Sequence, residues 1–244
     1  MGDEILFLSD CHLDARRPET GKALLDFLET RTADAAKLYI LGDLFEVWVG
    51  DDDPAEAHRP VIEALNALAK RCDVFFIAGN RDFLLGEAFA SRSGMTLLSE
   101  PEILQLGEKR VALMHGDTLC TDDHDYQAFR TMVRDPEWIA ATLARPLEER
   151  QQLAARLRDD SASAMSEKSS EIMDVNEAAV VEAFSDSGAD VIVHGHTHRP
   201  AIHDYPSGKK RIVLGDWHAE PSYLRWRADS GFTLTDPRIS AQTA

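Results

Sequence analysis

The 244-residue sequence places Asp, Asn and His repeatedly at the ends of short apolar runs. Tyr39–Leu41 leads through Gly42 into Asp43, and four further runs end in the same way, at Asp10 and His12, at Asn80, at His115, and at His194, His196 and His198. Carboxylate, amide and imidazole groups are together the ligands of hard to borderline divalent metals. A lone Asp after such a run is more often a turn or helix-cap residue. The recurrence of the pattern therefore predicts a metal site.

The apolar runs have the length and the aliphatic or β-branched character of buried β-strands. Gly42 ends its run abruptly and leaves Asp43 at the carboxyl end of the strand. Open α/β sheets bind their ligands at this end of the strands. We therefore expect the five runs to be strands that deliver their polar residues to one edge. The runs lie at 5–8, 39–41, 74–78, 111–114 and 191–193.

The intervening segments complete an α/β pattern. Apolar spacing predicts helices at 21–31, 55–71, 83–93 and 176–185, and strands at 95–98 and 102–106 in a second, mixed part of the sheet. Later strands are expected at 212–214, 223–226 and 232–234, with a loose tail at 240–244. The acidic triplet Asp51–Asp53 is interpreted as a loop that caps the helix at 55–71, and a second metal site is the alternative.

The segment from Asp125 to about Ile172 has almost no strand signal. Its apolar residues recur at helical spacing, and Pro136 and Pro146 indicate helix starts. Between Tyr126 and Arg158 six Arg stand against four acids, which gives a local balance of +2 in a chain of formal net charge -17. We predict a helical cap at 125–172 inserted into a core of 1–124 and 173–244, where an anionic ligand or membrane surface is favoured.

Composition limits the functional classes. The acidic net charge argues against sequence-independent nucleic-acid binding, which requires basic patches. No run reaches the ~18 apolar residues of a membrane span, and no signal segment precedes the first strand, so a soluble, cytosolic protein is expected. Three Cys without CxxC spacing fit a reducing compartment. Cys11 is expected to be a small packed residue, because strand alternation points it away from Asp10 and His12.

Five short motifs, in this order, resemble those of the calcineurin-like metallophosphoesterases: Asp10-x-His12, Gly42-Asp43, Gly79-Asn80-Arg81-Asp82, His115-Gly116-Asp117 and Gly195-His196-Thr197-His198. The resemblance spans most of the chain. It implies an α/β fold in which two mixed β-sheets pack as a sandwich flanked by helices. It also implies metal-dependent hydrolysis of a phosphate ester or anhydride.

The same resemblance implies a ligand set. Asp43 bridges two ions, Asp10, His12 and His198 complete one site, and Asn80, His115 and His196 complete the other. Two ions held close together clamp both ends of an in-line displacement and activate a water for attack. Oxygen-rich ligation with some His suits Mn²⁺, and Fe, Zn and Co remain open.

Arg81 is a departure within this superfamily. Many members carry His after the Gly-Asn pair, where it is regarded as the acid for a leaving alcohol. Arg cannot release a proton near neutral pH, but its guanidinium can hold phosphate oxygens bidentately. A phosphate monoester needs little protonation as it leaves. The residue therefore points to cleavage of a diphosphate, with Asn80 and Arg81 as the catalytic residues.

Longer stretches narrow the resemblance. The segments at 79–86, 115–123, 172–176 and 194–200 resemble the UDP-2,3-diacylglucosamine diphosphatase family of lipid A synthesis. That family acts with Mn²⁺ on a nucleotide-lipid diphosphate at the cytoplasmic face of the bacterial inner membrane. The resemblance implies substrate contacts through Asn80, Arg81 and His196 in the core and through Asp123, Ser161, Met165 and Lys168 at the cap. Met165 stands where a polar residue is expected, which puts that one contact in question.

Two other functional classes remain open at this point. A general phosphodiesterase or phosphoprotein phosphatase would share the metal ligands but would favour His at position 81 and would not need the long insertion. A non-catalytic scaffold on the same fold is the other, although no ligand position is missing here. The remaining His residues fit no ligand spacing. His194 is expected to be structural, and surface positions are expected for His58, His124, His203 and His218.

Overall fold

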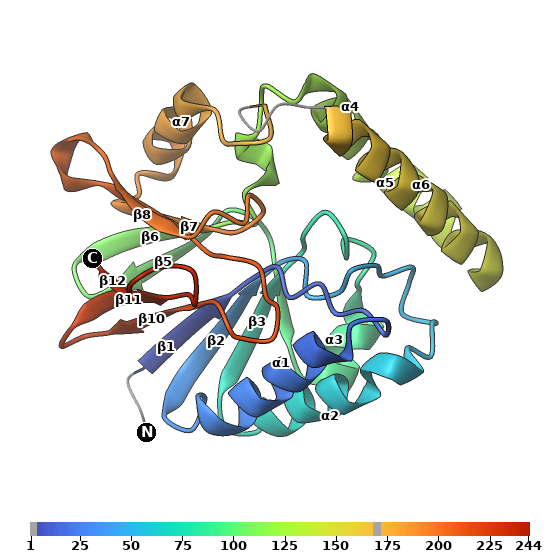
Figure 1. Cartoon of the computed structure of the whole chain (residues 1–244), viewed down its shortest axis with the longest axis horizontal. Coiled ribbons are helices and arrows are strands. Elements are labelled where there is room, and N and C mark those ends of the chain that lie inside the picture. The colour runs from blue at the N-terminus through green and yellow to red at the C-terminus, as the bar shows by residue number, and fades with distance from the viewer. Residues whose placement is uncertain (1–3, 168–171) are drawn as a thin grey trace.

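The computed structural model describes the backbone of residues 4–167 and 172–244 and the side chains of 4–158 and 172–244. Two β-sheets stack face to face, and helices cover both outer faces (Figure 1). Within the described residues the first sheet has seven strands, in the order β12 (Gln242–Thr243), β11 (Gly231–Thr235), β10 (Tyr223–Arg227), β1 (Glu4–Leu8), β2 (Ala35–Leu41), β3 (Asp73–Ile77) and β4 (Thr96–Leu98). The second has five, in the order β5 (Glu102–Leu106), β6 (Lys109–Leu113), β7 (Val191–His194), β9 (Lys210–Val213) and β8 (Ala201–Asp204). Both sheets are mixed, as the resemblance implied.

The helices fall into three groups. On the outer face of the first sheet lie α1 (Pro18–Thr30), α2 (Arg59–Leu68) and α3 (Glu87–Ser93), and over the second sheet lies α7 (Glu177–Ser187) (Figure 1). The third group stands apart from both and contains α4 (His124–Val133), α5 (Pro136–Leu143) and α6 (Leu147–Glu167). These three helices lie where helical spacing and the two prolines predicted them. No helix among the described residues is both long and apolar enough to cross a bilayer.

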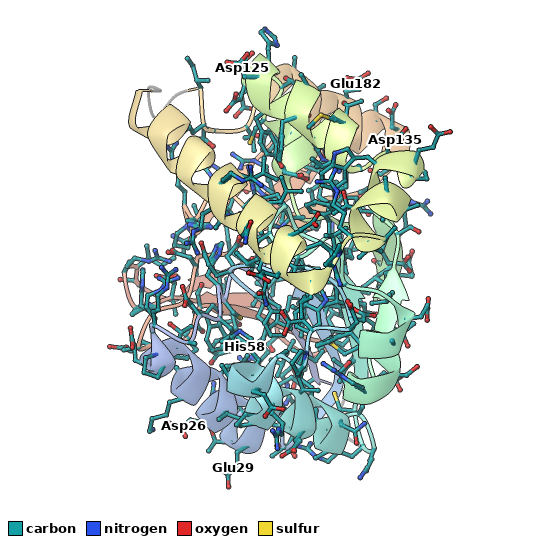
Figure 2. All side chains as sticks on the ribbon, turned by 90° about the vertical axis from the view of Figure 1, so that its right-hand side faces the viewer. Asp26, Glu29, His58, Asp125, Asp135 and Glu182 are labelled. Carbon is teal, nitrogen blue, oxygen red and sulfur yellow. The ribbon has the colours of Figure 1, made fainter. Side chains whose placement is uncertain are left out.

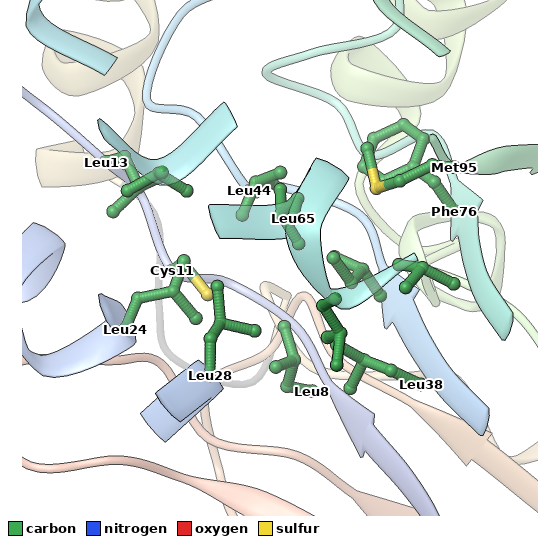
Figure 3. Close-up of a cluster of buried hydrophobic side chains, with 14 of the residues drawn as sticks. Leu8, Cys11, Leu13, Leu24, Leu28, Leu38, Leu44, Leu65, Phe76 and Met95 are labelled. Carbon is green, nitrogen blue, oxygen red and sulfur yellow. The ribbon is translucent and has the colours of Figure 1, made fainter. Parts of the chain in front are cut away.

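Alternation along the buried strands separates the core into layers. In β1, Leu6 and Leu8 pack with the helices of the first sheet, whereas Ile5 and Phe7 point into the space between the sheets. Successive side chains of a strand point to opposite faces, so a strand buried on both sides reads as a continuous apolar run. Figure 3 shows the layer under α1–α3, in which Cys11 packs beside Leu24 and Leu28. Cys11 is therefore a packed residue, as predicted.

Several element boundaries differ from the sequence predictions. Residues 83–86 form a turn before α3, and the helix predicted from residue 55 begins at Arg59 after a short 3₁₀ turn. The strand near residue 96 pairs with β3 in the first sheet instead of joining β5. The tail predicted to be loose forms β12, which pairs with β11, and β8 was not predicted. Periodicity identifies strands, but pairing partners depend on contacts that are distant in sequence.

The acidic triplet forms a loop, as predicted, and Asp53 accepts the amide hydrogen of Ala55 at 2.8 Å, but Asp51 and Asp52 have other roles. The carboxylate of Asp51 accepts the amide hydrogens of Gly86 at 3.1 Å and Phe89 at 2.8 Å, so it caps α3 and not the helix that follows the triplet. Asp52 forms an ion pair with Arg150 of α6. Among the described residues the triplet belongs to no cluster of potential metal ligands. It is a structural junction between core and helical segment.

Candidate metal centre

The loops that leave β1 and β2 run side by side and carry the first predicted ligands. The amide of Asp10 donates to the carbonyl of Gly42 at 3.0 Å, and the amide of His12 donates to the carbonyl of Asp43 at 2.9 Å. Because β1, β2 and β3 are parallel neighbours, their carboxyl ends meet at one edge of the sheet. Asn80 follows β3 and joins the same edge.

The second sheet brings its ligands to this edge from the other side. His115 follows β6, and His196 and His198 follow β7, its parallel neighbour. The amide of Gly195 donates to the carbonyl of His115 at 2.9 Å, which fixes the two loops together. The amide of His196 donates to the carboxylate of Asp10 at 3.0 Å, across the gap between the sheets. The ligand edge is thus a joint feature of both sheets.

The predicted ligands have an unusual backbone. Among the described residues, seven non-glycine residues have positive φ, and five of these are Asp10, His12, Asp43, His196 and His198. Left-handed backbone is rare for residues with a Cβ and costs on the order of 1–3 kcal/mol each. Such strain persists where the surrounding structure demands it, and it concentrates at functional sites. The backbone therefore singles out the same residues as the sequence motifs.

One group of candidate ligand atoms belongs to Asp10, His12 and His198. Nε2 of His198 lies 3.2 Å from Oδ1 of Asp10 and 3.2 Å from Nε2 of His12. Nε2 of His12 is 3.8 Å from the same oxygen of Asp10. Two imidazole nitrogens and a carboxylate oxygen thus converge on one small space, within 4.8 Å of one another.

A second group consists of Asn80, His115 and His196. The amide oxygen of Asn80 lies 2.9 Å from Nε2 of His115 and 3.0 Å from Nδ1 of His196. The two imidazole rings meet edge to face, with centroids 5.1 Å apart. Two imidazoles and one neutral amide oxygen therefore converge beside the first group.

Asp43 lies between the two groups and turns one oxygen toward each. Its Oδ2 is 3.8 Å from Nε2 of His12, and its Oδ1 is 3.8 Å from Nε2 of His115. The amide of Arg81 donates to the same Oδ1 at 2.8 Å. Because Asp43 is almost fully buried, at 2% exposure, its charge requires partners inside the protein. A carboxylate in this position has the geometry expected of a bridge between two cations.

Three of the imidazoles are oriented by contacts of their other nitrogen. Nδ1 of His115 donates to the carbonyl of Leu41 at 2.8 Å, which leaves Nε2 free to bind a metal. Nδ1 of His12 is 3.0 Å from a carboxylate oxygen of Glu46, and Nδ1 of His198 is 3.6 Å from one of Asp216. Carboxylate and carbonyl partners of this kind fix the ring orientation of metal-binding His residues.

Glu46 and Asp216 were missed by the sequence reasoning. A signal for Asp216 was present, because Leu214-Gly215-Asp216 repeats the strand-glycine-aspartate pattern of Leu41-Gly42-Asp43. Glu46 had no such signal. Glu46 lies three residues beyond Asp43 in the sequence, and it contacts His12 only because the loop folds back toward that residue.

Asp82 holds the loop around Asp43. Its buried carboxylate accepts the amide hydrogens of Gly79 at 2.9 Å, Asp43 at 3.2 Å and Leu44 at 2.7 Å, with a further contact to Phe45 at 3.3 Å. Burial, and then the nearby charge of Asp43, raises the pKa of Asp82 to about 7. The carboxylate of Asp82 thus binds backbone amides, and among the described residues it forms no ion pair.

The site has a strongly negative electrostatic character. Burial lowers the pKa of His115, but the charges of Asp43, Asp10 and Asp117 outweigh it and raise the pKa to about 9. Burial, and then the charge of His115, lowers the pKa of His196 to about 4. Carboxylates that stabilise a buried imidazolium also stabilise a metal cation in the same place. The donor set and the local charge therefore both fit divalent metals.

Two glycines allow the ligand loops to approach closely. A Cβ on Gly79 would lie 2.1 Å from Oδ1 of Asp43, and a Cβ on Gly195 would lie 2.2 Å from Oδ2 of Asp10. Neither contact is possible for a real side chain. The glycines in the Gly79-Asn80 and Gly195-His196 motifs are thus required by packing against the ligands themselves.

A cavity of about 500 Å³ opens from the ligands toward α4–α6. His12, Asp43, Asn80, His196 and His198 line its polar end. Its walls are largely apolar and come from the core residues Val47, Trp48, Val49, Phe83 and Leu84 and from the helical residues Phe129, Trp138, Leu153, Ala154 and Leu157. Figure 2 looks onto these helices, with Asp125 near the start of α4 and Asp135 at the turn into α5. The cavity joins a cation site to an apolar chamber of ligand size.

The predicted substrate-binding residues lie at this cavity where they are described. Arg81 lines it beside Asn80 and His196. Asp123 also lines it, and its carboxylate accepts the amide hydrogen of Tyr126 at 3.1 Å and so caps α4. The side chains of Ser161 and Met165, and the whole of Lys168, lie outside the described residues.

Four apolar residues at helical spacing in the segment 125–172 are candidates for a lipid groove, but only two of them are part of the cavity wall. Trp138 and Leu153 line the cavity, whereas Ile139 and Leu143 do not, and Leu143 is 40% exposed. Helical spacing placed all four on apolar faces, but only the packing of α5 against the core decides which face meets the cavity. Ile139 is therefore not a groove residue.

Four of the five remaining His residues agree with their predictions, and His58 does not. His194 is fully buried and contacts the guanidinium of Arg211 at 3.2 Å, and burial lowers its pKa to about 3. His124, His203 and His218 are exposed. His58 is half-buried against the ring of Phe45 and is not a surface residue.

A family model described as calcineurin-like phosphoesterase matches residues 4–200. The UDP-2,3-diacylglucosamine hydrolase of Sodalis glossinidius (strain morsitans) is 50% identical over 221 residues, which cover 90% of this chain and 92% of the relative. The protein of that name from Escherichia coli O81 (strain ED1a) is 50% identical over 230 residues, which cover 92% and 95%.

A solved structure shares the fold at much lower identity. The crystal structure of a Vps29 single mutant from Entamoeba histolytica aligns with a TM-score of 0.51 at 16% identity, and covers 99% of this chain and 98% of that one. The family match and the clustered ligands together identify the strand-end edge as a site for divalent metals. Since the fold, the ligand groups and the relatives agree, the chain is a hydrolase that belongs to the calcineurin-like phosphoesterase family.

Proposed function

We propose that this chain hydrolyses the diphosphate bond of UDP-2,3-diacylglucosamine and releases UMP and 2,3-diacylglucosamine 1-phosphate. The observation that carries the proposal is the position of Asp43, which turns one oxygen to each of two ligand groups at the polar end of a largely apolar cavity. The names of relatives at 50% identity point to the same substrate. A nucleotide-lipid diphosphate has both the anionic centre and the apolar tails that such a cavity can accommodate.

The ligand set supports two Mn²⁺ ions. Asp10, His12 and His198 would hold one, Asn80, His115 and His196 the other, and Asp43 would contact both. When bound, such a pair lowers the pKa of a shared water and neutralises charge on the diphosphate oxygens. Asn80 would contribute an uncharged oxygen and so would leave the two ions more acidic than a third carboxylate would.

The role proposed for Arg81 is to hold the diphosphate. Its side chain lines the cavity next to Asn80, while its amide is bound to Asp43. Asp82 and Asp51, the carboxylates with which it could form a surface ion pair, are instead bound to backbone amides. No carboxylate in the described part of the chain lies within 4.0 Å of its guanidinium. The planar fork is therefore available to two phosphate oxygens.

The cavity walls support a role for the segment 125–172 as a cap that holds the acyl chains. Phe129, Trp138, Leu153 and Leu157 face the cavity from α4–α6, and Phe83 faces it from the core. Fully burying an apolar side chain of this size contributes roughly 1.5–3 kcal/mol. Substrate contacts through Asp123, Ser161, Met165 and Lys168 at this cap remain part of the proposal.

We place the protein at the cytoplasmic face of the inner membrane, as a peripheral protein. The substrate is itself a membrane lipid, and the segment from Tyr126 to Arg158 carries the local balance of +2. Met132 of α4 and Leu143 of α5 are large apolar residues that are 50% and 40% exposed. Basic and apolar groups on one segment favour contact with an anionic lipid surface. Co-sedimentation with anionic but not neutral vesicles is the expected result.

A substrate comparison with Mn²⁺ present tests the activity. The panel is UDP-2,3-diacylglucosamine, UDP-GlcNAc, bis-p-nitrophenyl phosphate and a phosphopeptide, with the Asp43→Ala protein as a blank for contaminating enzymes. We expect turnover of the first far above that of the others. Preference for bis-p-nitrophenyl phosphate or the phosphopeptide would instead identify a general phosphodiesterase or phosphatase, and no turnover of any would favour a scaffold.

A further inference from the structure

Helix α4 presents three polar side chains to the metal centre. Tyr126, Arg130 and Arg134 are spaced four residues apart, with Arg134 at the C-cap, so they lie along one face of the helix. This helix is the first of the α4–α6 group and also contributes Phe129 to the cavity wall. The same helix thus contacts both the proposed lipid cavity and the loops behind the metal ligands.

Arg134 binds the backbone that leads into Asn80. Its Nη2 donates to the carbonyl of Gly79 at 2.9 Å and contacts the carbonyl of Ala78 at 3.3 Å. The guanidinium also lies over the ring of Phe83, 5.1 Å from its centroid. The two carbonyls immediately precede Asn80, so Arg134 limits where the amide oxygen of Asn80 can lie.

Arg130 reaches the backbone of His115 through a carboxylate. Its Nη2 donates to one oxygen of Glu100 at 3.0 Å, and the other oxygen of Glu100 accepts the amide hydrogen of His115 at 2.9 Å. Its Nε donates to buried Asp117 at 2.8 Å, two residues beyond His115. Arg130 therefore stabilises the loop of His115 from two directions.

Tyr126 and Gln127 complete this contact. The hydroxyl of Tyr126 donates to the carboxylate of Asp117 at 2.7 Å, and its ring lies 5.7 Å from that of His196, centroid to centroid. Nε2 of Gln127 donates to the carbonyl of Asp117 at 2.8 Å. Each residue of the Asn80–His115–His196 group therefore either contacts a side chain of α4 or lies in a loop that α4 stabilises.

The other ligand group is supported differently. His12 lies against Glu46 and His198 against Asp216, both of which belong to the core loops. The carbonyl of Asp10 accepts the amide hydrogen of Trp217 at 3.0 Å, and its carboxylate is bound by the hydroxyl of Ser9. In the described part of the chain, no hydrogen bond or ion pair joins α4 to this group.

We infer that α4 is a positioning helix for one metal site only, the site of Asn80, His115 and His196. This inference rests on the two-ion proposal above. Partners that orient metal ligands from behind typically contribute 10- to 100-fold to metal affinity. Removing Arg130 or Arg134 should therefore lower the affinity for one ion by about tenfold or more and leave the affinity for the other unchanged. Arg130 and Arg134 are positioning residues, because they act through the ligand loops.

Mn²⁺ titration of the metal-free protein by calorimetry tests this directly. Arg130→Ala and Arg134→Ala are each combined with His12→Ala, which disables the first site, and with His115→Ala, which disables the second. In the His12→Ala protein the remaining ion should bind about tenfold more weakly, or worse, when either arginine is removed. In the His115→Ala protein the dissociation constant of the remaining ion should change less than about twofold.

Matched variants separate positioning from general damage. Arg156→Ala removes one positive charge from α6, where the described hydrogen bond of Arg156 goes to the carbonyl of Gln152 in the same helix, and should change neither ion. Arg130→Lys and Arg134→Lys keep the charge but lose the fork, and should recover part of the affinity. The Lys variants provide the same comparison for an Ala variant that does not fold.

The outcomes are distinct. Selective weakening in the His12→Ala background, with partial recovery by Lys, supports the inference. Equal weakening in both backgrounds, or none in either, overturns it and leaves the two-ion proposal intact. A single ion in the unmodified protein would overturn the two-ion proposal and this inference with it.

Discussion

The metal centre and the helices α4–α6 hold their functional residues by different means. At the centre, five predicted ligand positions have left-handed backbone, and the buried carboxylate of Asp82 binds the amides of the adjoining loops. In α4–α6 the residues that face the cavity follow ordinary helical spacing. Polar attachment to the core is concentrated in a few arginines, such as Arg150, which is 3% exposed and binds Asp52 and the carbonyl of Val49.

This difference corresponds to the demands of the two tasks. Metal ligands have to be held to within about half an ångström, which local strain and many backbone hydrogen bonds can achieve. An acyl chain requires an apolar wall of sufficient area, which several combinations of side chains can supply. Single substitutions should therefore abolish chemistry at the centre, whereas substitutions of the apolar cavity residues on the helices should change substrate affinity.

The largest effect is expected for Asp43→Ala. Loss of the shared carboxylate should remove both ions and lower kcat by more than about 10³-fold, beyond the loss caused by one stabilising donor. Metal analysis of the purified protein is the measurement. His12→Ala and His115→Ala serve as controls, since each should mainly weaken one ion. An Asp43→Ala protein that retains two tightly bound ions would show that Asp43 is not the bridge.

The second largest effect is expected for Arg81→Ala. The variant should keep its fold and both ions and lose about 10²- to 10³-fold in kcat, the usual cost of removing a preorganised charge. Arg81→Lys should recover only part of this, because Lys lacks the planar fork. Steady-state kinetics and metal content are measured together. Near-normal kcat with a small change in thermal stability would return Arg81 to the role of a surface residue.

A smaller effect on KM is expected for Leu153→Asp in α6. A charge in the cavity wall should raise KM for the lipid substrate roughly tenfold, since burial of a side chain of this size contributes about 1.5–3 kcal/mol. Metal content should not change. Ile139→Asp is the matched control, because Ile139 is also half-buried on these helices but does not line the cavity.

A deacylated or short-chain substrate completes the comparison. Leu153→Asp should affect its turnover much less than that of the full substrate. Equal loss on both substrates, or an equal effect of Ile139→Asp, would assign these apolar residues to ordinary helix packing and would contradict the lipid cavity.

The smallest effect is expected for Asp51→Ala. Its carboxylate accepts two amide hydrogens at the start of α3 and the indole Nε1 hydrogen of Trp48 at 3.0 Å, so the free energy of unfolding should fall by about 2 kcal/mol. Asp53→Ala should cost less, because Asp53 accepts one amide hydrogen, from Ala55. Denaturant unfolding measures both. Loss of a bound metal from Asp51→Ala would instead restore the metal interpretation of the triplet.

Much of the centre could be predicted from the sequence because its pattern is local. Residue type, an apolar run and a following glycine place Asp43 at a strand end without knowledge of the rest of the fold. The parallel arrangement of such strands then brings their ends together. All seven predicted ligands lie at the ends of parallel strands for this reason, although two sheets supply them and the packing of the sheets brings the two sets together.

The sequence alone determined which residues lie at the strand ends and which helical faces are apolar, because both follow from the geometry of one element. Only the tertiary structure decided which faces meet. It placed Leu153 at the cavity and Ile139 away from it, turned Asp51 toward α3, and brought Glu46 and Asp216 to the imidazoles. The physical reason is that periodicity specifies the direction of a side chain within its own element, whereas its partner depends on how distant elements pack.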